Sequence, residues 1–255
     1  MQPDLYAEMV ALEVKHFWFR ARREVLEACL ARFLPENVPR VILDAGCGTG
    51  ANFGMLGRFG NAIGVDVFHD ACVYATRKHP GLIAQGKLES LPVAKASIDL
   101  AVLLDVLEHV DNQQAVLAEM QRILRLDGLL VVSVPAFQHL WSNHDVVHCH
   151  RRRYKANELR RELEKAGFHI DYLGYFNTHL YGLVALTRFL KKHRVNEPRS
   201  DMRPPPKWLN ALLYNVFRVE KFWVGRFAMP IGVSLLAVVR KIDVGAPCLD
   251  INENK

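Results

Sequence analysis

The chain has 255 residues, of which 50% are hydrophobic and 24% are charged, and its net charge is +6. This length and composition support one sizeable buried core, so we expect one α/β domain rather than two independent domains. The positive charge permits an anionic partner, and the five cysteines, which include no C-x-x-C pair, indicate a reduced, cytosolic chain.

The first expected element is a helix over residues 4–34, with apolar positions on one face and Pro35 at its end. The first residues lack the basic-then-apolar pattern of an export signal, so we expect none. No apolar run in the sequence reaches the roughly 20 residues that cross a bilayer.

A buried strand then leads into the glycine-rich segment VILDAGCGTGA (41–51), and a second apolar strand, AIGVDVF, carries Asp66. Glycines let the backbone turn tightly and approach a ligand. Gly46, Gly48 and Ala51 also satisfy the G-x-G-x-x-G/A fingerprint of dinucleotide sites. Asp44 decides against a dinucleotide, because its carboxylate would repel a pyrophosphate but attract the ammonium and sulfonium of S-adenosylmethionine. The alternative is a purely structural glycine turn. A helix diluted by glycines is expected next, over residues 52–60.

The third strand is expected at 82–85 and the fourth at 98–106. The fourth is apolar throughout and ends beside Asp105, Glu108 and His109, at the edge where open parallel sheets bind ligands. Asp111 and Gln114 match a capping box for the next helix, and Glu108 is alternatively a residue that only stabilises the start of that helix.

DAGCGTG with the following GVD resembles the first two motifs of class I S-adenosylmethionine-dependent methyltransferases, especially the UbiE-like small-molecule group. The resemblance continues through LESLPVAKASIDLAVLLDVLEHV (88–110) and MQRILRLDGLLVVSVP (120–135), and it covers residues 39–134. It implies a Rossmann-like α/β fold with a seven-stranded, mostly parallel sheet, helices on both faces, an N-terminal helical cap (1–38), a cofactor-binding core (39–178) and a last strand with tail (231–255). Before the last strand we expect a helical insertion (179–230), where the generic fold of the family needs only a hairpin.

The cofactor expected from this resemblance is S-adenosylmethionine, which becomes S-adenosylhomocysteine. Arg20, in the cap segment HFWFRARR, is the expected partner of the cofactor's carboxylate. Lys87 stands where the family usually has an acidic or small polar residue near the adenine. The full expected cofactor-binding set is Arg20, Asp44, Gly46, Gly48, Gly50, Asp66, Val67, Lys87, Leu88, Asp105 and Val106.

After a fifth strand at 129–134, the loop is rich in histidine and arginine, and a helix (157–166) and a strand (169–177) follow it. Motifs like WSxHD…HRRRY recur in a bacterial subset of the family, which makes His144 and His150 candidate general bases. The expected substrate-binding residues are His109, Asp145, Arg152, Arg153 and Tyr154, although a solvated basic helix start is the alternative. His144, Asp145, His148 and His150 are metal-ligand types, but their spacing does not place them together, so the sequence predicts no metal site.

The insertion contains two apolar helical patterns, at 179–194 and 206–227, and the last strand is expected at 232–241. The connection before the last strand lies at the ligand-binding edge of such a sheet, so we expect the insertion to roof the acceptor pocket and to contact a lipophilic substrate or a membrane face. Packing against the core or a dimer contact is the alternative.

The sequence therefore predicts an S-adenosylmethionine-dependent methyltransferase that acts on a small-molecule or lipid-linked acceptor, most simply at oxygen. The alternatives are a regulatory or scaffolding subunit without turnover and a nucleic-acid methyltransferase, which only the charge favours. We expect a cytoplasmic monomer or homodimer that contacts the inner membrane face peripherally.

Overall fold

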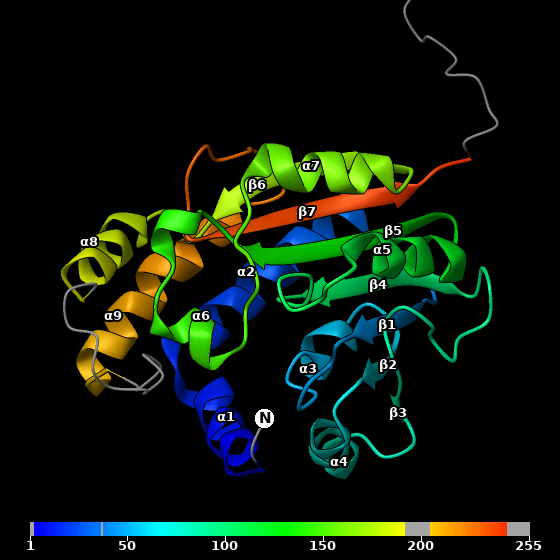
Figure 1. Cartoon of the computed structure of the whole chain (residues 1–255), viewed down its shortest axis with the longest axis horizontal. Coiled ribbons are helices and arrows are strands. Elements are labelled where there is room, and N and C mark those ends of the chain that lie inside the picture. Colours follow the sequence, from blue (N-terminus) through cyan, green and yellow to red (C-terminus); the bar gives the residue numbers. More distant parts are fainter. Residues whose placement is uncertain (1–2, 37, 192–204, 244–255) are drawn as a thin grey trace, which may run out of the picture.

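One sheet of seven strands forms the centre of the protein (Figure 1), in the order β3-β2-β1-β4-β5-β7-β6. The computed structural model describes residues 3–36, 38–191 and 205–243. Among the described strands, β7 alone runs antiparallel to its neighbours β5 and β6, and the other neighbouring pairs are parallel. The predicted seven-stranded, mostly parallel sheet is confirmed. The strands are β1 (Val41–Ala45), β2 (Asn61–Asp66), β3 (Ile83–Gln85), β4 (Ile98–Leu104), β5 (Leu124–Pro135), β6 (Phe168–Phe176) and β7 (Ser234–Lys241).

Helices cover both faces of this sheet, as predicted. On one face α5 (Gln113–Ile123) and α7 (Ala156–Lys165) contribute residues such as Leu117 and Leu159 to a core cluster. On the other face α2 (Phe17–Phe33), the short α3 (Phe53–Leu56) and α9 (Lys207–Arg218) contribute Leu26, Leu56 and Phe217 to a second cluster. Helix α4 (His69–Lys78) follows β2.

The single helix expected over residues 4–34 is two helices, α1 (Pro3–Lys15) and α2. The helix is interrupted at His16, whose side chain accepts a hydrogen bond from the backbone N of Trp18 at 3.2 Å. Asn210 of α9 stabilises the break, since it accepts from the backbone N of Phe17 and donates to the carbonyl of Lys15, both at 2.9 Å. The cap and the insertion are therefore joined, and α1 reaches the glycine turn, where Thr49 donates to Glu13 at 2.5 Å.

The insertion begins at the carboxyl edge of the sheet, as predicted, because Phe176 at the end of β6 lies opposite Ser234 at the start of β7. It contains α8 (Tyr181–Lys191), α9 and η2 (Val219–Phe222). The buried Glu220 accepts from the backbone N atoms of Asn177, Thr178 and His179 at 2.6, 2.7 and 3.0 Å and so fixes its entry. Residues 192–194, the end of the first helical pattern predicted for the insertion, lie outside the described ranges, as does most of the proline-rich segment between the two patterns. No helix within the described ranges is long and apolar enough to cross a membrane.

Two local expectations are wrong. The helix expected over 52–60 is only α3, because its glycines favour turns over helix. Helix α5 is capped by Asn112, which accepts from the backbone N of Ala115 at 3.1 Å, rather than by Asp111.

Candidate active site

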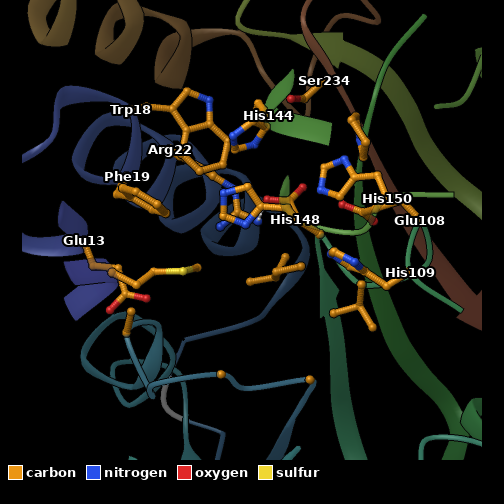
Figure 2. A pocket seen from close by; sticks show the side chains of 18 of the residues that line it. Glu13, Trp18, Phe19, Arg22, Glu108, His109, His144, His148, His150 and Ser234 are labelled. Carbon is orange, nitrogen blue, oxygen red and sulfur yellow. Dashed lines mark ion pairs between the residues drawn. The ribbon is translucent and has the colours of Figure 1, made fainter. Parts of the chain in front are cut away.

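A cavity of about 1180 Å³ lies at the carboxyl edge of the sheet. Its walls come from α1 and α2, the turn after β1, the ends of β2 and β4, the segment around α6 (Asn143–Val147), and the insertion. Figure 2 shows Glu13 and Phe19 from the cap on one side and Glu108, His109 and His150 on the other. The insertion contributes Leu180, Val184 and Leu213, so it does cover part of the cavity. The volume exceeds the ~300–1,000 Å³ typical of one ligand site, which leaves room for a cofactor and an acceptor.

The glycine turn forms one wall of the cavity. Gly46 has φ +81°, and a Cβ there would lie 2.6 Å from Cγ2 of Val106, so only glycine fits. Asp66 holds this turn: one carboxylate oxygen accepts from the backbone N of Gly48 and the other from that of Phe68, both at 2.9 Å. Gly46, Gly48, Asp66, Val67, Leu88, Asp105 and Val106 all line the cavity, as the sequence predicts for cofactor-binding residues.

Asp44, Gly50 and Lys87 do not line this cavity. Asp44 lies within β1 and is fully buried, and neither of its oxygens has a hydrogen-bond partner among the described residues. Burial raises the pKa of Asp44 to about 7, although the Asn52 side chain and the charge of Arg22 oppose this rise. The direct contact expected between Asp44 and the cofactor is therefore not what this geometry offers.

The cap arginines that line the cavity are Arg22 and Arg23, and Arg20 does not line it. Arg20 is exposed, and its guanidinium lies 4.3 Å from the ring centre of Tyr214. Arg22 is buried, pairs with Asp105 at 2.7 Å and donates to Ser133 at 2.8 Å. Two positions along an α-helix differ by about 200° in direction, so the correct face depended on the docking of α2.

Asp105 and Glu108 follow β4 at the edge of the cavity. Asp105 has φ +58°, a left-handed conformation uncommon outside glycine, and it accepts from Ser133 at 3.2 Å as well as pairing with Arg22. Glu108 is fully buried, and neither carboxylate oxygen has a hydrogen-bond partner among the described residues. Burial, together with the charge of Asp105, raises the pKa of Glu108 well above its usual range. The interpretation of Glu108 as a helix-start residue does not account for this position.

Asp145 is the centre of a buried charge network. Arg153 donates to its two oxygens at 2.8 and 3.0 Å, and Nδ1 of His150 lies 2.9 Å from one of them. Burial would raise the pKa of Asp145, but His150 and Arg153 hold it below its usual range. A charged Asp145 favours the proton on Nδ1 of His150, which leaves the Nε2 lone pair available.

The other histidines of this wall lie beside His150. The ring centre of His109 is 4.8 Å from that of His150, and the ring centres of His144 and His148 are 4.3 Å apart. Burial lowers the pKa of His109 to about 4, that of His144 to about 2, and that of His148 in the same direction. These three side chains are therefore neutral at neutral pH.

Three residues after His150 contact the loop that follows β4, namely Arg151, Arg152 and Tyr154. Arg152 and Tyr154 do not line the cavity. The backbone N of Arg151 donates to the carbonyl of Glu108 at 2.8 Å. The side-chain Nε of Arg151 donates to the carbonyl of His109 at 2.9 Å. Arg152 donates to the carbonyl of Val110 at 3.1 Å. The hydroxyl of Tyr154 donates to the carbonyl of Leu107 at 3.1 Å. Arg152 and Tyr154, which the sequence predicts to bind the substrate, make contacts that fix this loop.

The family described as a methyltransferase domain matches residues 43–132. A probable S-adenosylmethionine-dependent methyltransferase of Mycolicibacterium smegmatis is 33% identical over 180 residues, which cover 69% of this chain and 68% of that protein. A probable enzyme of the same kind from Mycobacterium tuberculosis is 32% identical over 161 residues, 62% of this chain and 57% of the relative's length. A chain in the complex between the Haloferax volcanii Trm112 methyltransferase activator and a methyltransferase superimposes with a TM-score of 0.61 at 17% identity, covering 94% of this chain and 97% of that one, which shows the shared fold.

The fold and the glycine turn thus define a class I, Rossmann-like protein. The chain belongs to the S-adenosylmethionine-dependent methyltransferases. The described residues fit that cofactor, because the turn exposes Gly48 to open space and the Asp66 carboxylate, suited to ribose hydroxyls, lies in the same cavity.

Proposed function

We propose that the protein transfers a methyl group from S-adenosylmethionine to a hydroxyl oxygen of a small-molecule or lipid-linked acceptor. The observation that carries this proposal is one shared cavity, with the glycine turn and Asp66 on one wall and Glu108, His109 and His150 on another. When bound, the cofactor supplies an electrophilic methyl group, so the protein's tasks are alignment and removal of the hydroxyl proton.

Of the two predicted bases, His150 has the better geometry. Asp145 orients its ring through Nδ1, which is how a carboxylate prepares a histidine to accept a proton at Nε2. No comparable carboxylate contact orients His144 among the hydrogen bonds described. His150 is therefore the better-oriented candidate to take up a proton at Nε2.

We also propose a lipophilic acceptor and a peripheral contact with a membrane surface. Leu180, Val184 and Leu213 of the insertion line the cavity. The outer side of the same insertion exposes large apolar side chains, which suits a membrane interface better than water. They are Leu183, Leu186, Phe189, Leu190, Trp208, Leu212, Phe222 and Phe227. Among the basic residues of the insertion, Lys207 is exposed, whereas Lys221 pairs with Glu24 at 3.1 Å.

Cofactor binding by the wild type and by Asp66→Asn tests the first part of the proposal. The amide cannot accept hydrogen bonds at both positions as the carboxylate does, so binding of S-adenosylmethionine should weaken by on the order of 10- to 100-fold, or roughly 1.5–3 kcal/mol. Asp70→Asn is the matched control, because Asp70 lies in the first turn of α4 outside the cavity lining. Titration calorimetry should show normal affinity in the control. Equal affinity in all three proteins would contradict the role of Asp66.

Turnover is tested with radiolabelled S-adenosylmethionine and extracts of lipids and small metabolites. Label should enter an organic-soluble or small-molecule product, and His150→Ala should abolish the transfer while cofactor binding persists. Tight cofactor binding with no labelled product in any extract would favour the regulatory or scaffolding alternative.

A further inference from the structure

We infer that Glu108, His109 and His150 bind a divalent transition-metal ion in the wall of the cavity. The role of this ion rests on the proposed function, whereas the test of metal binding does not depend on it. Each of the three residues offers one ligand atom, and these atoms all lie within 4.8 Å of one another. Zn²⁺ binds imidazole nitrogen and carboxylate oxygen at about 2.0–2.2 Å, which requires donor atoms roughly 3–4 Å apart. An ion bound there would draw the three donors together from at most 4.8 Å to that spacing.

Glu108 gives an independent reason to expect a cation. It is fully buried, and both of its oxygens lack a hydrogen-bond partner among the described residues. The nearest arginines are engaged elsewhere, since Arg22 pairs with Asp105 and Arg153 with Asp145. A buried carboxylate without hydrogen bonds is costly unless a cation binds it or a proton neutralises it. Glu108 faces the cavity between two histidines (Figure 2), where a metal ion would satisfy it.

The surroundings of His150 prepare it as a ligand. Asp145 holds Nδ1 at 2.9 Å, and Arg153 fixes Asp145 through two hydrogen bonds. Metal-bound histidines commonly donate their other ring N–H to such a carboxylate, which sets the tautomer and the ring orientation. The loop that carries Glu108 and His109 is fixed in turn by Arg151 and Arg152. The cluster is thus built from two loops whose positions are held by hydrogen bonds.

Two imidazoles and one carboxylate leave coordination positions open toward the cavity, as in catalytic rather than structural metal sites. An oxygen of the acceptor would occupy such a position and be oriented there. The lone pair on Nε2 of His150 cannot bind a metal ion and accept a proton at once, so metal binding decides which of these two roles His150 has.

The test measures binding of the metal alone to the 255-residue chain after treatment with a chelator. Calorimetry with Zn²⁺ should show one site, and Co²⁺ should give the visible absorption of a nitrogen- and oxygen-coordinated ion. Glu108→Gln and His109→Ala should each weaken binding by on the order of 100-fold or more. His139→Asn is the matched control: His139 is exposed, lies outside the cavity lining and should leave affinity and stoichiometry unchanged.

Thermal unfolding of every variant, together with its affinity for S-adenosylmethionine, shows whether it is folded. Absence of stoichiometric metal binding in a protein that binds the cofactor overturns the metal site and leaves the proposed function standing. Metal binding that persists in both Glu108→Gln and His109→Ala, or that is lost in His139→Asn, also overturns it. Metal binding without cofactor binding would instead overturn the proposed function alone.

Discussion

Asp44 makes the stability of the cofactor-free protein depend on pH. Its side chain is fully buried, and burial raises its pKa to about 7, from about 3.9 in an exposed aspartate. The folded state therefore keeps this proton to a higher pH than the unfolded state does. Consequently the free energy of unfolding falls as the pH rises from about 4 to about 7, and this contribution is constant above that range.

The size of the effect follows from the shift. At about 1.4 kcal/mol per pKa unit, ionisation of the buried Asp44 lowers the free energy of unfolding by about 4 kcal/mol in full. About 2.5 kcal/mol of this decrease occurs between pH 5 and pH 8. Asp44→Asn keeps the shape of the side chain but cannot ionise. Its unfolding free energy should lack this part of the pH dependence.

The assay is urea unfolding of both proteins without cofactor at pH 5, 6, 7 and 8. Titrations of other groups occur in both proteins and cancel in the difference. The unfolding free energy of Asp44→Asn minus that of the wild type should rise by about 2–3 kcal/mol across this range. A difference that stays constant with pH would refute the idea that Asp44 is buried and unpaired in the folded protein.

Two further changes test the contacts around the cavity. Tyr154→Phe removes a hydroxyl that lies 3.1 Å from the carbonyl of Leu107 and 2.8 Å from Oε1 of Gln113. Urea titrations should show that the free energy of unfolding falls by about 1–3 kcal/mol. Unchanged stability would restore the substrate-binding interpretation of Tyr154. On the insertion, the double variant Leu186→Ser, Trp208→Ser should reduce co-sedimentation with anionic vesicles several-fold, because both side chains are more than half exposed. Leu126→Ser, an equally exposed leucine on β5, should bind vesicles like the wild type, and equal binding by all three proteins would rule out contact through α8 and α9.

The sequence was sufficient for the features that depend on short-range pattern. Continuous apolar runs identified the buried strands, and the glycines with Asp66 identified a turn that lines the cavity. Because the order of strands and helices in a doubly wound sheet follows from these elements and from the family resemblance, the sheet and the place of the insertion were also predicted correctly. The finer boundaries were less accurate, as in α3, where glycine outweighs the apolar pattern.

The tertiary structure decided which side chains meet. The spacing of arginines in the cap could not select Arg22 over Arg20, because that choice depends on how α2 is rotated against the sheet and α9. Likewise, Arg152 was expected to bind substrate but donates to the carbonyl of Val110, 42 positions away in the sequence. Glu108 and His150 are likewise far apart in the sequence. They reach one cluster only because the loops after β4 and β5 lie side by side at the same edge of the sheet. No local periodicity encodes such a contact, since it results from the packing of elements that are each specified separately.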